Sequence, residues 1–127
     1  MPDSCCPPDH RGAIDERYGA AALAQEPCLC TAVPFDPELL RVIPEEVVSR
    51  DYGCGDPTRW VRPGNRVLDL GSGSGKNAFI CSQLVGAEGS VLGLDRNLNM
   101  LDLANGACPQ VASQIGYANV SFRRAEI

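Results

Sequence analysis

RVLDLGSGSGKNAFICSQLVGAEGSVLGLD, residues 66–95, is the stretch of this chain that decides its fold. Apolar runs at 66–70 and 90–94 have the length and composition of buried strands. The glycine-rich run at 71–75 turns out of the first strand into an expected helix over 76–85. A strand, a glycine turn, a helix and a second strand form the opening unit of a parallel α/β sheet.

The chain after this stretch continues the same alternation. Asn97 is the expected N-cap of a second helix, Pro109 is expected to start a further helical turn, and 119–123 is expected to be a third strand. We therefore predict an α/β fold, a Rossmann-like doubly wound parallel sheet whose first half spans residues 63–127. A complete sheet of this type has about seven strands, so the fold is expected to be truncated after the third.

The first half of the chain has a different character. Residues 1–12 contain three prolines and no periodicity, which predicts a flexible tail. Residues 13–62 are expected to be a helical N-terminal segment with cysteine-containing loops. Apolar residues at helical spacing predict a helix over 13–25, and two short helices are expected to begin after Asp36 and at Pro44.

Composition excludes several classes of protein. The 127 residues carry 11 Lys and Arg against 16 Asp and Glu, and the net charge of -5 argues against general nucleic-acid binding. No apolar run approaches the roughly 20 residues of a membrane span. The N-terminus MPDSCCPPDH lacks the features of a secretory signal. We expect a soluble, cytoplasmic protein with neither nucleic-acid nor membrane partners.

The glycine turn has a clear chemical use. Glycines let the backbone approach a ligand closely, and the start of the following helix offers unbonded N–H groups. Asp95 ends the second strand, where a carboxylate accepts hydrogen bonds from ribose hydroxyls. Asp69 lies inside the first strand, and Glu126 follows the third strand, where it could reach an adenine amino group.

The turn has three other interpretations. A phosphate-binding loop is rejected, because Leu70 stands where that motif needs glycine and Asn77 where it needs Ser or Thr. A nicotinamide-binding fold stays open, although it prefers a different glycine spacing and seldom has an acid in its first strand. In the third interpretation, the glycines only make a tight turn.

Two short motifs carry a family resemblance. VLDLGSGSG at 67–75 and VLGLD at 91–95 resemble the first two motifs of class I S-adenosylmethionine-dependent methyltransferases. YGAAALAQ at 18–25, IPEEVVSRDYGCGDP at 43–57 and RPGNRVLDLGSGSGKNAF at 62–79 resemble the N-terminal part of the arsenite methyltransferase family. The resemblance covers most of the chain from residue 14 onwards and implies S-adenosyl-L-methionine as the cofactor.

This resemblance also assigns roles to residues. It implies that Asp69 and the glycines of the turn hold the methionine part of the cofactor, that Asp95 binds the ribose hydroxyls and that Glu126 binds the adenine. The cofactor-binding residues that we expect are Asp69, Gly71, Ser72, Gly73, Gly75, Lys76, Asp95, Arg96 and Glu126.

Lys76 begins the helix after the glycine turn, where a cation opposes the helix macrodipole by about 0.3–1 kcal/mol. One hypothesis is that Lys76 faces the carboxylate of the cofactor, which would offset this cost. The alternative is a solvated surface lysine.

Seven cysteines and no export signal favour free thiols or metalloid ligands over disulfides. Trivalent arsenic is a soft acceptor that favours thiolates, and Cys54 matches the place of one such thiol in the family pattern. Cys28 and Cys30 resemble the family's N-terminal cysteine pair but are separated by one residue. Cys54 could instead pack in its loop, and no C-x-x-C pair favours zinc. Cys81 and Cys108 are expected to be structural, and the single histidine argues against a His-rich site.

The resemblance implies transfer of a methyl group from the cofactor's sulfonium to a small soft acceptor, arsenite being the acceptor of the family. No general base is needed when the acceptor has its own lone pair, so no catalytic residue is assigned. Two alternatives stay open: methylation of another molecule, with Cys54 only packing, and a noncatalytic thiol module that binds metalloid. A three-stranded sheet also leaves an edge exposed, which predicts self-association through that edge.

Overall fold

The computed structural model describes residues 35–51 and 55–127. The expected tail at 1–12 and the expected helix over 13–25 lie outside these residues. In chain order the elements are α2 (Pro37–Leu40), α3 (Glu45–Ser49), β1 (Arg66–Leu70), α4 (Lys76–Val85), β2 (Ser90–Asp95), α5 (Leu98–Ile115) and β3 (Val120–Arg124).

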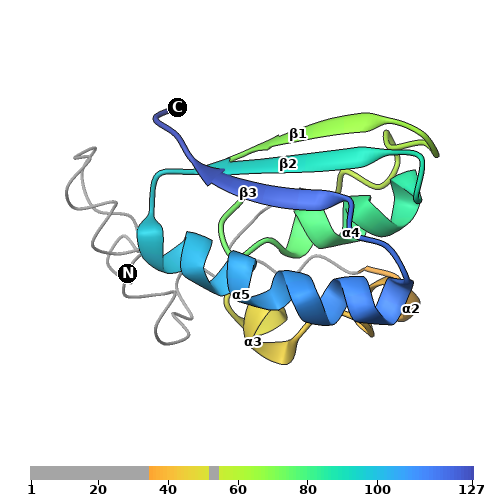
Figure 1. The fold of residues 1–127 in the computed structure, drawn as a ribbon, viewed down its shortest axis with the longest axis horizontal. Helices are drawn as coiled ribbons and strands as arrows, with labels where there is room; N and C mark the ends of the chain where they lie inside the picture. The colour runs from red at the N-terminus through yellow and green to blue at the C-terminus, as the bar shows by residue number, and fades with distance from the viewer. Residues whose placement is uncertain (1–34, 52–54) are drawn as a thin grey trace, which may run out of the picture.

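The three strands form one parallel sheet in the order β1-β2-β3. Asp69 of β1 is paired with Gly93 of β2, which is paired in turn with Phe122 of β3. Helices α4 and α5 lie on the same face of this sheet, and α2 and α3 pack on the side of these helices away from the strands (Figure 1). The predicted Rossmann-like α/β fold is thus confirmed, as a three-stranded parallel sheet with helices α4 and α5 on one face.

Short polar side chains begin two of the helices, as predicted. The Asp36 carboxylate accepts a hydrogen bond from the backbone N–H of Glu38 at 3.0 Å, and Pro37 occupies the first turn of α2. The Asn97 side chain accepts one from the N–H of Met100 at 3.1 Å at the start of α5. Each cap satisfies a backbone donor that the first helical turn leaves without an intrahelical partner.

The region around Pro109 differs from the prediction. No new turn starts there, because α5 runs without interruption from Leu98 to Ile115 with Pro109 inside it. Proline removes one backbone hydrogen bond from a helix. Ala107 and Val111, on either side of it, are buried in the core. We infer that their packing holds the helix together through the proline. The third strand also begins and ends one residue later than predicted.

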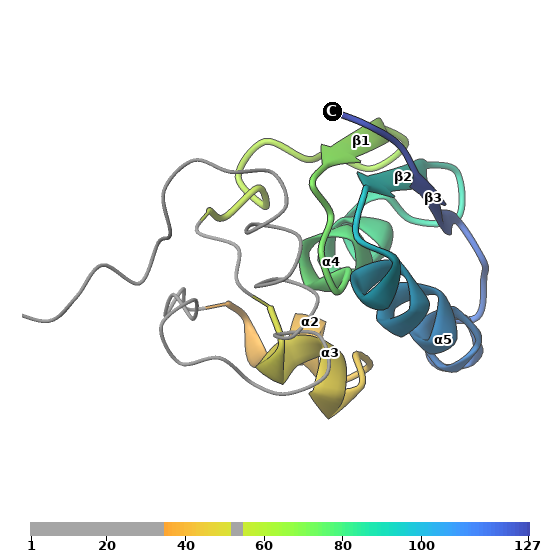
Figure 2. The same cartoon turned by 90° about the vertical axis from the view of Figure 1, so that its left-hand side faces the viewer.

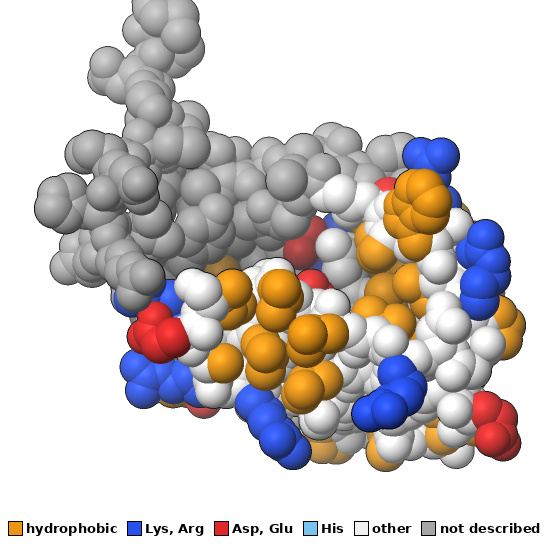
Figure 3. Space-filling view, turned by 90° about the horizontal axis from the view of Figure 1, so that it is seen from above, with side chains coloured by type: hydrophobic (Ala, Val, Ile, Leu, Met, Phe, Trp, Pro, Cys, Tyr) orange, Lys and Arg blue, Asp and Glu red, His pale blue; other side chains and the backbone are white. Residues whose placement is uncertain are grey.

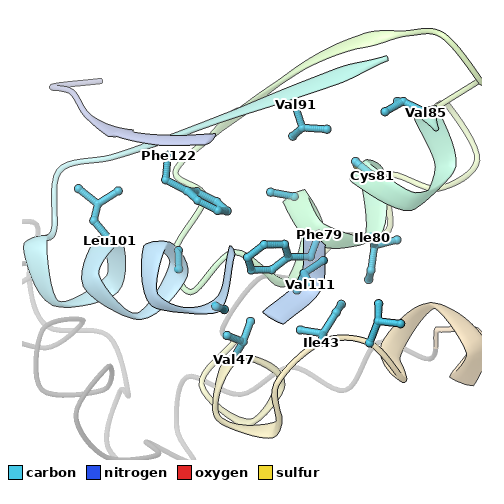
Figure 4. Packing of buried hydrophobic residues seen from close by; sticks show 14 residues of the cluster. Ile43, Val47, Phe79, Ile80, Cys81, Val85, Val91, Leu101, Val111 and Phe122 are labelled. Atoms are coloured by element: carbon cyan, nitrogen blue, oxygen red, sulfur yellow. The ribbon is translucent and has the colours of Figure 1, made fainter. Parts of the chain in front are cut away.

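The core lies between the sheet and its helices and continues to the N-terminal segment (Figure 4). Phe79 of α4 and Phe122 of β3 meet edge to face, with their ring centroids 5.3 Å apart. On the far side of α4 and α5, Ile43 and Val47 close the core from below. The segment that contains α2 and α3 is therefore packed as part of the same domain.

Only one face of the sheet is covered by described residues. Leu68 and Leu70 of β1 point to the other face and are 56% and 58% exposed, and Leu92 and Leu94 beside them are half-buried. Figure 3 looks onto this face and shows hydrophobic side chains gathered there. The expectation of fully buried strands is wrong for these positions, because alternate side chains of a strand point to opposite faces. No described helix is long and apolar enough to cross a membrane.

Candidate functional site

The carboxyl ends of the three strands bring the predicted site residues to one edge of the sheet, which faces the viewer in Figure 2. The glycine turn at 71–75 leaves β1 there, and Asp95 ends β2. The backbone N–H of Ala125 donates to the carbonyl of Asp95 at 3.0 Å, which places Glu126 beside the same strand end. Ligands of open α/β sheets bind at this edge.

The glycine turn is tied to the end of β2 by its own backbone. The carbonyl of Leu94 accepts hydrogen bonds from the N–H groups of Gly71 at 2.8 Å and Ser72 at 2.9 Å. The N–H of Gly73 donates to Oδ2 of Asp95 at 2.9 Å. The turn and the strand end therefore form one hydrogen-bonded unit.

Both oxygens of the Asp95 carboxylate are held in place. Oδ2 accepts from Gly73, and Oδ1 accepts from the N–H of Asn97 at 2.9 Å. A carboxylate oxygen accepts more than one hydrogen bond, so each keeps acceptor capacity for a ligand. The arrangement orients Asp95 as an acceptor for a pair of hydroxyl donors.

Two positions at this edge require glycine. Gly75 has φ 99°, in the left-handed region, and a Cβ built on it would lie 2.8 Å from Cζ of Phe122. A Cβ at Gly93 would lie 2.5 Å from Cδ1 of the same ring. Phe122 therefore fills the space that side chains at these positions would take, and its ring supports the turn from the core side.

Asp69 is a half-buried acid beneath the turn. Partial burial, together with the smaller effect of the neighbouring carboxylates of Asp51 and Asp95, raises the pKa of its carboxyl from the usual 3.8 to about 6. Its Oδ2 atom is buried and has no hydrogen-bond partner among the described residues. A bound cation or hydrogen-bond donor would satisfy this oxygen and favour its charged form.

Ser72 gives the turn a second unmatched group. Its side chain is buried, and its Oγ has no hydrogen-bond partner in the described part of the chain. Buried polar atoms without partners are uncommon in folded proteins and need an explanation. The lone Ser72 hydroxyl, the free acceptor on Asp69 and the oriented carboxylate of Asp95 together fit a ligand that offers both a cationic group and hydroxyls.

Lys76 is buried rather than solvated, so the surface-lysine interpretation is wrong. Its Nζ lies 2.7 Å from Oδ2 of Asp51, and the two side chains are only 8% and 9% exposed. The same ammonium sits 4.3 Å from the centre of the Phe35 ring. A charged group removed from water needs a close partner of opposite charge, and Asp51 supplies it.

Arg96 and Glu126 lie together beyond the strand ends. The Nε of Arg96 is 3.9 Å from Oε2 of Glu126, and the Glu126 side chain is 65% exposed. Nε of Arg124 also donates to the carbonyl of Arg96 at 3.3 Å. The structure thus brings the predicted adenine-side acid next to the loop that follows Asp95.

The predicted thiol ligands Cys54, Cys28 and Cys30 lie outside the described residues. Cys81 is buried on α4, where burial raises the pKa of its thiol to about 11 and keeps it protonated and unreactive. Cys108 is half-buried and donates to the carbonyl of Ala104 at 3.5 Å. Residues 35–51 and 55–127 contain no group of three side chains placed to hold a metal ion.

The segment 35–51 contributes to the site in a way that the sequence did not predict. Asp51 was not among the predicted site residues, although it contacts Lys76 and acts on Asp69. Ser74 was not predicted either, and its hydroxyl donates to the carbonyl of Val47 at 2.9 Å. The only signal in the sequence was an unmatched cation at the start of α4, which indicates that an acid is needed but not which one.

The chain matches a known protein family and is similar to named relatives. A family model described as a methyltransferase domain matches residues 62–127. The arsenite methyltransferase of Aquipseudomonas alcaligenes is 47% identical over 89 residues, which are 70% of this chain and 26% of that protein. The human arsenite methyltransferase is 35% identical over 108 residues, 81% of this chain and 29% of that protein.

A solved structure agrees with these relatives. The crystal structure of an arsenic(III) S-adenosylmethionine methyltransferase from Chlamydomonas reinhardtii matches with a TM-score of 0.68 and 35% identity. The match covers 74% of this chain and 33% of that one. The chain thus spans between a quarter and a third of the length of these three relatives.

Proposed function

We propose, because this chain belongs to the methyltransferase domain family, that its glycine turn and strand ends bind S-adenosylmethionine for methyl transfer to trivalent arsenic. The observation that carries the proposal is the hydrogen-bonded unit of turn and strand end, in which Gly73 orients the carboxylate of Asp95. The bound cofactor would supply a methyl group already activated by its sulfonium.

Each described residue has a defined part in this proposal. Asp95 would accept hydrogen bonds from the two ribose hydroxyls with the acceptor capacity that its backbone contacts leave over. Asp69 and Ser72, with their unmatched oxygens, would hold the amino-acid end beside the glycines of the turn, Gly71, Gly73 and Gly75. Glu126 would bind the adenine, next to Arg96.

The fit of these residues is electrostatic as well as geometric. S-adenosylmethionine carries an ammonium and a sulfonium, and the carboxylates of Asp51 and Asp95 each lie close enough to Asp69 to repel its charged form. A cationic ligand relieves the repulsion between these carboxylates and replaces the hydration that Asp69 loses on burial. Binding would therefore shift Asp69 towards its charged form.

The acceptor rests on the relatives and on the sequence motif around Cys54. Relatives named as arsenite methyltransferases match the chain over 70–81% of its length. Thiolates suit trivalent arsenic because both are soft and polarizable, and Cys54, with Cys28 and Cys30, is the proposed source. We place the reaction in the cytoplasm, where thiols stay reduced.

The experiment is a calorimetric titration of S-adenosylmethionine into the 127-residue chain, with Asp95→Ala as the site variant. We expect saturable binding that the substitution abolishes, because the ribose loses its acceptor. Asp102→Ala, an exposed acid on α5, is the matched control. Absence of binding by a chain whose circular dichroism shows it to be folded would refute the cofactor assignment.

A second titration, with arsenite, tests the acceptor. We expect Cys54→Ser to weaken arsenite binding and to leave the affinity for the cofactor unchanged. Arsenite binding that is unaffected by Cys54→Ser would favour methylation of another small molecule. Tight arsenite binding by a folded chain that never binds the cofactor would favour a noncatalytic thiol module.

A further inference from the structure

Three polar contacts tie the segment 35–51 to the glycine turn and to the helix that follows it. The hydroxyl of Ser74, inside the turn, donates to the carbonyl of Val47 at 2.9 Å and is buried. The ammonium of Lys76 lies 2.7 Å from the carboxylate of Asp51. Farther along α4, the side-chain amide of Gln83 donates to the carbonyl of Leu39 at 2.7 Å.

The Lys76–Asp51 pair stands out among these contacts, because both side chains are more than nine-tenths buried. Taking two charges out of water is costly, and an apolar pair of similar volume often serves stability as well or better. Lys76 also begins α4, where the helix macrodipole opposes a cation, and the first turn of α4 contains no acid. Stability of the fold alone is therefore a poor explanation for this pair.

The pair also lies next to the candidate site. Lys76 directly follows Gly75, the last glycine of the turn, and Asp51 is close enough to Asp69 for their carboxylates to repel each other. The ammonium also contacts the Phe35 ring, whose centre lies 4.3 Å away. Lys76 thus joins the end of the segment 35–51 to the start of α4, and it balances the negative charge of Asp51.

We propose that Lys76 and Asp51 are positioning residues, whose mutual contact fixes the end of the segment 35–51 against the glycine turn in the geometry that cofactor binding requires. The inference rests on the proposed function and deepens it. It gives Lys76 an indirect role, since the lysine acts through Asp51 and not by contact with the cofactor's carboxylate. An ion pair suits this task because its short contact has a defined direction, which packing between aliphatic side chains lacks.

The test compares single and paired substitutions in the 127-residue chain, with cofactor affinity and unfolding temperature measured on each. Asp51→Asn and Lys76→Met each leave an unpaired buried polar group or charge, so both are expected to unfold at lower temperature and to bind about tenfold more weakly. The pair Asp51→Leu with Lys76→Met removes both charges. It is expected to regain the unfolding temperature but not the affinity.

A purely structural pair would behave differently. If Asp51→Leu with Lys76→Met binds the cofactor as tightly as the unsubstituted chain, the positioning role is refuted. If Asp51→Asn keeps full affinity while Lys76→Met loses it, the lysine contacts the cofactor directly and the inference is also wrong. Lys76→Arg preserves the charge contact and is expected to bind within about threefold of the unsubstituted chain.

The chain offers a matched control on the same segment. Glu38 and Arg41 form an ion pair at 3.4 Å whose side chains are 77% and 69% exposed. Glu38→Gln with Arg41→Met is expected to leave cofactor affinity unchanged, because exposed pairs contribute little. If the unsubstituted, folded chain fails to bind the cofactor, the proposed function itself is refuted and this inference with it. Loss confined to the buried-pair variants supports the inference.

Discussion

Asp69→Asn should make the chain more stable at neutral pH. The folded chain holds the Asp69 proton up to about pH 6, because the carboxyl is buried and lies near the carboxylates of Asp51 and Asp95. The unfolded chain releases it near the usual 3.8. Folding therefore takes up a proton between these values, and the free energy of unfolding falls as the pH rises from about 4 to 6.

The structure sets the size of this effect. Each pH unit between the two pKa values is worth about 1.4 kcal/mol, so the ionised Asp69 lowers the free energy of unfolding by about 3 kcal/mol above pH 7. Between pH 4.5 and 7.5 the change is about 2 kcal/mol, since the unfolded chain is already mostly ionised at the lower pH. Asparagine cannot ionise, so the variant lacks this loss.

The assay is urea unfolding of both chains at pH 4.5 and at pH 7.5. Substitution adds a contribution that does not depend on pH, and this contribution cancels when the stability differences at the two pH values are compared. We expect the variant to gain about 2 kcal/mol on the unsubstituted chain between these pH values. Asp102→Asn, on the exposed side of α5, controls for the change of side chain itself.

A stability difference that is the same at both pH values would refute the reasoning, because Asp69 would then cost nothing to ionise in the folded chain. We also expect Asp69→Asn to weaken cofactor binding, since the neutral amide attracts an ammonium less than a carboxylate does. The same substitution would therefore stabilise the fold and impair the site, as expected of a residue whose burial serves a ligand.

Three further predictions concern packing and the sheet face. Gly93→Ala should lower the free energy of unfolding by about 1–3 kcal/mol, because its Cβ would lie 2.5 Å from the Phe122 ring, and Phe122→Leu in the same chain should recover part of the loss in urea unfolding. Ser74→Ala should cost about 1–3 kcal/mol in the same assay, since a buried carbonyl of α3 loses its donor. We expect the chain to self-associate in sedimentation, and Leu68→Lys with Leu70→Lys to reduce this association; a monodisperse unsubstituted chain would contradict it.

The parts of the fold that local patterns determine were predictable from the sequence. Apolar runs of strand length around a glycine turn specify the β1–α4–β2 unit, and the carboxyl ends of parallel strands necessarily share an edge, which brings Asp95 beside the turn. The cap at Asn97 is equally local, because its side chain bonds a backbone group three residues away.

Features that depend on contacts between distant segments were not predictable. The partner of Lys76 comes from the end of the segment 35–51, and nothing in the spacing of residues identifies Asp51. The continuity of α5 through Pro109 depends on packing of the residues around it. The exposure of Leu68 follows from which face the helices cover, which an apolar strand does not reveal by itself.

The close packing of the Phe122 ring against Gly75 and Gly93 has a consequence for the order of folding. The strand, turn and helix of residues 66–95 are local and can form early, but the ring that supports their turn belongs to β3, far along the chain. Closing so distant a contact is slow compared with forming a helix. Substitutions at Phe122 should therefore change mainly the unfolding rate, with φ-values near zero, and the turn should reach its final shape late. During synthesis, the glycine turn would reach its final shape only after Phe122 has left the ribosome.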